Sequence, residues 1–115
     1  MIHKLLLIIF LLLSSIKGID SSKVRHGNIR TFKTGQLVHL VDSQKVYLQM
    51  KPYKTIIKEK LKKGQARYVK LMSECTALYT STLGKSGFSL IVESDGVDKT
   101  LHKTEDITQK LISLL

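Results

Sequence analysis

The 115-residue sequence has little cysteine and asparagine, the residues that form disulfides and carry N-linked glycans in many small secreted domains. Cys75 is its single cysteine, so the chain forms no intramolecular disulfide and a hydrophobic core alone must hold the fold. Asn28 is its only asparagine, and Ile29 and Arg30 follow it, so there is no N-glycosylation site. Cys75 lies in an apolar-leaning stretch, which favours a buried thiol; the alternative is an intermolecular disulfide.

Metal-binding and catalytic motifs are also missing. His26, His39 and His102 are isolated, without the paired spacing of a zinc site. Because one cysteine and scattered histidines occur together by chance in many chains, we predict no catalytic residues, no metal site and no cofactor, and a protein that is not an enzyme.

Two further motifs fail on spacing. Gly84-Lys85-Ser86 resembles the end of a phosphate-binding P-loop, but Tyr79 stands where that loop needs its first glycine. The acidic residues Glu93, Asp95 and Asp98 lack the spacing of a calcium-binding EF-hand, so we interpret them as a solvated turn.

Residues 1–18 have the layout of a secretory signal peptide. A short basic start precedes an unbroken apolar run from Leu5 to Leu13, followed by the small residues Ser14, Ser15 and Gly18. The run is too short to cross a bilayer as a helix, and we expect no transmembrane segment elsewhere. Cleavage is expected after Gly18, with Ser15 as the alternative, which predicts one secreted domain over residues 19–115. Residence in the ER lumen or elsewhere in the secretory pathway is the alternative to release from the cell.

The charge is strongly positive and concentrated. The chain has 19 basic and 9 acidic residues, and residues 51–70 alone contribute a net charge of +7, with Glu59 as their only acid. Such a local patch on an otherwise near-neutral domain favours a specific anionic partner. The predicted anion-binding residues are Lys51, Lys54, Lys58, Lys62, Lys63, Arg67 and Lys70.

The first half of the domain predicts strands followed by one basic helix. Residues 19–27 are polar and predict a flexible entry, and a strand pattern begins at residues 28–32. Residues 36–41 and 45–50 are rich in β-branched and aromatic residues and predict a hairpin. Pro52 and the apolar spacing after it predict an amphipathic helix over residues 52–63, which Gly64 ends.

The second half predicts more strands and a closing helix. Strands are expected at residues 66–72, 76–82, 88–92 and 97–103, with a hairpin turn at Asp95-Gly96. Thr104 is expected to cap a final amphipathic helix, with Ile107, Leu111, Leu114 and Leu115 in one apolar stripe. The sequence therefore predicts an α+β fold, with a mostly antiparallel sheet of about five to seven short strands, one short basic helix and a C-terminal amphipathic helix.

These observations favour a secreted, cationic, non-enzymatic binding protein whose partner is an acidic glycan, an anionic surface or an acidic protein. Secretion makes nucleic acid a less favoured partner. The alternative is a structural or assembly subunit of a secretory-pathway complex, which docks through its apolar C-terminal helix.

Overall fold

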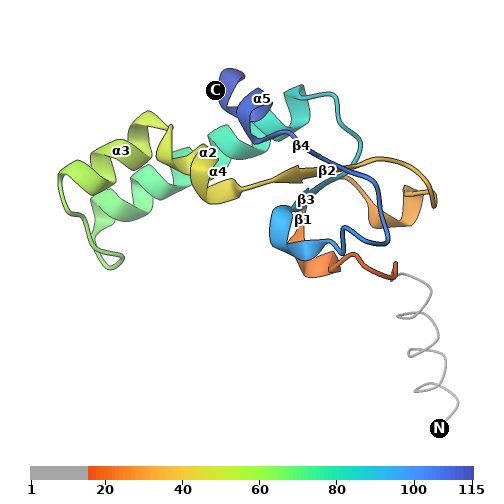
Figure 1. Cartoon of the computed structure of the whole chain (residues 1–115). Coiled ribbons are helices and arrows are strands. Elements are labelled where there is room, and N and C mark those ends of the chain that lie inside the picture. The colour runs from red at the N-terminus through yellow and green to blue at the C-terminus, as the bar shows by residue number, and fades with distance from the viewer. Residues whose placement is uncertain (1–15) are drawn as a thin grey trace, which may run out of the picture.

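A computed structural model describes residues 16–115, so the predicted signal-peptide core lies outside the described residues (Figure 1). The described strands are β1 (Val24–His26), β2 (Val38–Val41), β3 (Ile91–Glu93) and β4 (Thr104–Asp106). The α-helices are α2 (Ser43–Leu48), α3 (Lys51–Lys58), α4 (Ala66–Lys85) and α5 (Thr108–Ser113). Three single-turn 3-10 helices are η1 (Ser21–Lys23), η2 (Ile29–Thr31) and η3 (Ser94–Gly96).

The sheet is mixed, with the strand order β1-β3-β2-β4. Only β1 and β3 are antiparallel; β2 runs parallel to both β3 and β4. In the central pair His39 lies opposite Ile91 and Val41 opposite Glu93. Because parallel neighbours need a long crossover, the helices α2, α3 and α4 all lie between β2 and β3 in the chain.

Alternate residues of the central strands supply two hydrophobic clusters. Val41 and Ile91 face α2, α4 and α5 and join a cluster with buried residues of those helices. Val38, Leu40 and Val92 face the other way and pack with Ile19 and partly buried residues of the N-terminal segment. The sheet therefore lies between a helical layer and a layer of short turns and loops.

The predicted combination of helices and strands is right, but the mostly antiparallel sheet of five to seven strands is wrong. Residues 45–50 were expected to form a strand and instead belong to α2 and its C-terminal end. The Asp42 carboxylate accepts a hydrogen bond from the backbone N–H of Lys45 and caps this helix. Val46 and Met50, four residues apart, are then both buried on one side.

The largest difference is α4, which replaces the two strands predicted at residues 66–72 and 76–82. Its buried residues Cys75, Tyr79, Thr82 and Leu83 recur at the three- and four-residue spacing of a helix. Several of the β-branched residues that suggested strands, including Val69 and Thr80, are exposed. A β-branched side chain costs a helix only a few tenths of a kcal/mol, so the buried stripe decides the structure.

Other boundaries also differ from the prediction. Residues 29–31 form η2 instead of a strand, and Asp95-Gly96 lies in η3 instead of a hairpin turn. Thr104 begins β4 instead of capping a helix, and α5 begins only at Thr108. Residues 19–27, the expected flexible entry, contain η1 and β1. At Gly27 a Cβ would lie 1.9 Å from the carbonyl oxygen of Ser89, so only glycine fits there.

Candidate binding surface

Helices α3 and α4 form a hairpin that projects from the sheet (Figure 1). Its base is anchored by aromatic contacts: the ring of Tyr47 lies edge-on to Tyr53 at 6.0 Å and to Tyr79 at 5.1 Å. Ile56 of α3 and Cys75 of α4 are also buried. These contacts fix the direction of the hairpin relative to the body of the protein.

The turn of the hairpin has a defined structure. Helix α3 ends because Lys60 adopts a left-handed conformation, with φ of 52°. The backbone N–H of Leu61 donates to Ile56 O at 3.0 Å and that of Lys60 to Ile57 O at 3.2 Å, which is the Schellman pattern. The predicted stop at Gly64 is therefore wrong, and the helix ends at Lys58.

One ion pair closes the hairpin. Arg67 of α4 donates from Nε and Nη2 to the two carboxylate oxygens of Glu59, at 3.0 and 2.7 Å. The hydrogen bond from Arg67 lowers the pKa of the Glu59 carboxyl below its usual value. The same two groups thus position the turn and neutralise one another.

The seven predicted anion-binding residues all lie on this hairpin and all are exposed. Lys51, Lys54 and Lys58 are on α3, Lys62 and Lys63 in the turn, and Arg67 and Lys70 on α4. Arg67 is paired with Glu59, whereas none of the six lysines forms an ion pair with a residue of the described chain. Six cationic groups therefore remain available to an external partner.

Lys60 is a further member that the predicted set does not include. It is exposed and lies in the same turn as Lys62 and Lys63. Its charge was evident in the sequence, but the expected helix over residues 52–63 placed it on another face than Lys54, Lys58 and Lys62, which are four residues apart. The left-handed turn instead puts it at the end of the hairpin.

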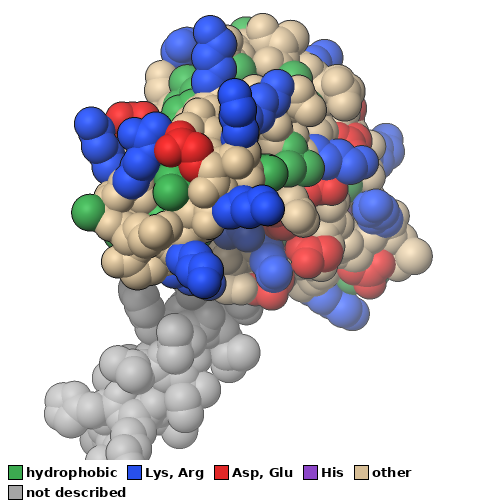
Figure 2. All heavy atoms as spheres, turned by 90° about the vertical axis from the view of Figure 1, so that its left-hand side faces the viewer, with side chains coloured by type: hydrophobic (Ala, Val, Ile, Leu, Met, Phe, Trp, Pro, Cys, Tyr) green, Lys and Arg blue, Asp and Glu red, His purple; other side chains and the backbone are tan. Residues whose placement is uncertain are grey.

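Apolar side chains are exposed between these lysines. Ile57 is 54% exposed and Val69 is 58% exposed. Figure 2, which views the hairpin end of the molecule, shows Lys and Arg side chains around this face with hydrophobic side chains between them. The surface is therefore both cationic and partly apolar.

A second polar cluster, which the sequence did not predict, lies where β2 and β3 end. Ser43 donates from its backbone N–H to Glu93 Oε1 at 2.8 Å and from its hydroxyl to Oε2 of the same carboxylate. Arg25 Nε donates to Glu93 Oε2 at 2.8 Å, and the hydroxyls of Tyr79 and Ser43 are hydrogen-bonded. Because Ser43 has one hydroxyl proton and gives it to Glu93, Tyr79 is the donor to Ser43.

This cluster links β1, α2, α4 and β3, and its Tyr79 and Glu93 side chains are largely buried. Burial raises the pKa of Glu93, but the hydrogen bonds from Arg25 and Ser43 outweigh it, so that pKa lies below its usual value. Burial raises the pKa of Tyr79 to about 12, so its hydroxyl stays protonated at neutral pH. Each of the four side chains is hydrogen-bonded to another member of the cluster, which makes it a structural network.

Asp95, Asp98 and Cys75 are not part of this cluster. Asp95 pairs with Lys23 at 3.4 Å, and Asp98 accepts hydrogen bonds from Thr100. Cys75 is fully buried on α4. Within residues 16–115, no three His, Cys, Asp or Glu side chains gather as metal ligands would.

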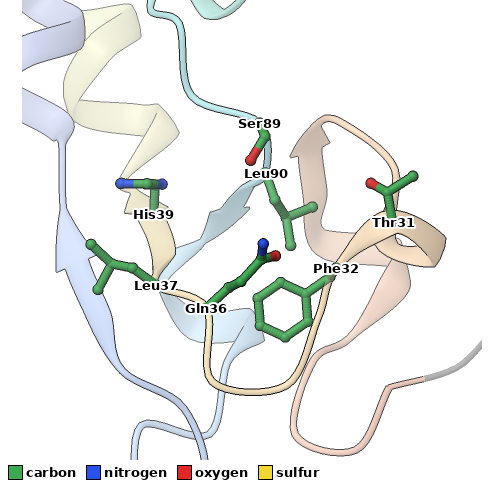
Figure 3. Close-up of a pocket in the computed structure, with 7 residues that line it drawn as sticks. All are labelled: Thr31, Phe32, Gln36, Leu37, His39, Ser89 and Leu90. Atoms are coloured by element: carbon green, nitrogen blue, oxygen red, sulfur yellow. The ribbon is translucent and has the colours of Figure 1, made fainter.

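A recess of about 250 Å³ is lined by residues of η2, β2 and the segment before β3 (Figure 3). The η2 segment lies at the opposite end of the molecule from the hairpin (Figure 1). Phe32, Gln36 and Leu90 point toward one another across it, while the ring of His39 lies to one side. His39 Nδ1 is buried and has no hydrogen-bond partner among the described residues. Because this atom is closed to solvent, a molecule in the recess would not reach it. The recess also lacks charged side chains, so it offers a weaker binding surface than the hairpin.

No family model, curated protein or solved structure matches this chain. Across residues 16–115, no helix has the length and apolar character to span a bilayer.

Proposed function

We propose that the protein is a small, secreted, cationic, non-enzymatic binding protein, which engages an acidic extracellular partner through the α3–α4 hairpin. The observation that supports this proposal is the set of exposed lysines without ion pairs on one projecting element, namely the six predicted lysines and Lys60. Like charges three and four residues apart, as at Lys51, Lys54 and Lys58, destabilise a helix by a few tenths of a kcal/mol per pair. A partner that neutralises them would recover that cost.

Binding of this kind works by exchange of counterions. Each acidic group of the partner that meets a lysine releases a bound ion, so the affinity falls steeply as the salt concentration rises. Sulfated glycans, anionic surfaces and acidic proteins share the chemistry that such a surface recognises.

Retention on a heparin column tests the proposal. The triple variant K58Q/K62Q/K63Q removes three charges from the hairpin, and K33Q/K99Q/K103Q removes three exposed lysines from elsewhere. The hairpin variant is expected to elute at clearly lower salt than the control variant, although both have the same net charge. Equal elution of the two variants would contradict a role for the hairpin.

Secretion is part of the proposal and rests on the leader sequence. Expression of the full chain in secreting cells, followed by N-terminal sequencing of protein from the medium, tests it. Protein found only inside the cells with residues 1–15 attached would contradict it, and trimmed protein held inside would indicate lumenal residence.

The alternative of an assembly subunit that docks through the C-terminal helix is less favoured. Ile107 and Leu111, which the sequence placed on the docking stripe, are both fully buried in the protein's own core. An intermolecular disulfide is likewise not part of the proposal, because Cys75 is fully buried.

A further inference from the structure

An apolar groove lies at the base of the hairpin, at the junction of α2, α3, α4 and the C-terminal residues. Its volume is about 310 Å³, at the lower end of the range of ligand pockets. Its apolar side chains are those of Met50, Pro52, Leu78 and Leu115, and Gln49 and Lys51 complete the lining. Leu115 is 37% exposed, so the groove is open to an incoming side chain.

The groove is continuous with the lysine row of α3. Lys51 lines it, and Lys54 and Lys58 follow three and seven residues later, on the same side of the helix. At a rise of about 1.5 Å per residue, this row extends about 10 Å from the groove toward the hairpin turn. A partner with a side chain in the groove would therefore have its neighbouring residues beside three cations.

We propose that this groove receives one large apolar side chain of an acidic polypeptide segment, whose carboxylates meet Lys51, Lys54 and Lys58. The inference rests on the proposed function and narrows the partner from any polyanion to a protein. A sulfated glycan offers negative charge but no apolar side chain of this kind, whereas a segment with Leu or Phe beside Glu or Asp matches both features. The lysines favour an acidic segment by charge complementarity. The groove then fixes which residue of that segment lies at the base of the hairpin.

Two synthetic fluorescent peptides test the inference by anisotropy with the full mature chain. Both have the same number of glutamates; one has a central leucine, and the other has serine in its place. The leucine peptide is expected to bind about tenfold more tightly, as burial of one aliphatic side chain implies. Equal affinity of the two peptides, or binding of heparin with no binding of either peptide, would overturn the inference.

Variants locate the effect. L115Q alters an exposed groove residue and is expected to reduce the preference for the leucine peptide to near zero, with unchanged retention on heparin. L101Q, which changes a leucine that is 49% exposed outside the groove, is the matched control and is expected to keep the preference. L78Q is a second groove variant, used after a thermal melt shows that it is folded; a preserved preference in both groove variants would overturn the inference.

The two proposals fail in different ways. If K58Q/K62Q/K63Q and its charge-matched control elute alike from heparin, the hairpin is not the anionic surface and the proposed function fails. If the hairpin variant elutes early but leucine adds nothing to peptide binding, only the groove assignment fails.

Discussion

Lys60 shows how a single residue shapes the proposed surface. A residue with a Cβ in the left-handed region costs about 1 kcal/mol relative to glycine, and Lys60 occupies that region at the C-terminal end of α3. Glycine at this position would relieve the strain and would also remove one charge from the hairpin end.

We predict that K60G raises the free energy of unfolding by about 0.5–1 kcal/mol, because relief of the strain exceeds the extra chain entropy of glycine. Urea denaturation measures the change. K63G is the control, since Lys63 is exposed in the same turn without a positive φ, and it should not gain stability. A loss of stability in K60G would contradict the strain argument.

Glu93 gives a prediction on pH. Its pKa is lowered in the folded protein, so its contribution to stability is present above the unfolded value of about 4.3 and disappears as the pH falls through the folded value. E93Q should therefore lose about 1–3 kcal/mol of unfolding free energy at about pH 7, and its difference from the native protein should shrink at about pH 3.

Urea denaturation at both pH values measures this difference. D95N is the control, because the Asp95–Lys23 pair is exposed and such pairs contribute little. An E93Q difference that is the same at both pH values would show that the charge of Glu93 is not the stabilising feature.

At the scale of elements, α4 has one buried face, which includes Cys75, Tyr79 and Leu83, and one exposed face. Its inner face buries Cys75 completely, and burial raises the pKa of that thiol above its usual value. A buried, protonated thiol is a poor nucleophile.

We predict that Cys75 reacts with a thiol reagent at least about 100-fold more slowly in the native protein than in denaturant, because reaction requires α4 to open. With an aromatic disulfide as the reagent, the absorbance of the aromatic thiolate that it releases measures the rate. A chain with C75A and T80C moves the thiol to an exposed position of the same helix and should react rapidly in the native state. Rapid labelling of Cys75 in the native protein would contradict the packing.

The sequence was informative where one periodicity dominated. The predicted strand at residues 36–41 contains β2, and the one predicted at residues 88–92 overlaps β3 at Ile91 and Val92, because these apolar, β-branched runs suit strands buried on both faces. Pro52 marked the start of α3 to within one residue. The concentration of lysines in residues 51–70 was also evident from the sequence, since charge density does not depend on the element that carries it.

The remaining elements needed tertiary information. In α4 the threonines and Val69 favoured strands locally, while the helical stripe of Cys75, Tyr79 and Leu83 was visible only over a longer window. Parallel pairing of β2 with β4 depends on a loop path that local sequence does not encode. The Ser43–Glu93 network joins residues 50 positions apart, so no spacing rule could reveal it.

At the scale of the whole molecule, residues 16–18 tie the N-terminal segment to the loop before β4. Ile16 packs on the cluster of Val38 and Leu40. The carbonyl oxygen of Lys17 accepts a hydrogen bond from His102 Nε2 at 2.7 Å, and that of Gly18 accepts one from the backbone N–H of Asp98 at 2.7 Å. These contacts bear on the two cleavage positions that the leader sequence allows.

A chain that begins at Ile16 keeps all three contacts, whereas a chain that begins at Ile19 loses them. We predict that the shorter chain is less stable by about 1–3 kcal/mol, the sum expected for two hydrogen bonds of modest net value and one partly buried isoleucine. Urea denaturation of the two purified chains measures the difference, and H102A in the longer chain should reproduce part of it. Equal midpoints would mean that residues 16–18 add nothing to the fold, and that cleavage after Gly18 carries no cost in stability.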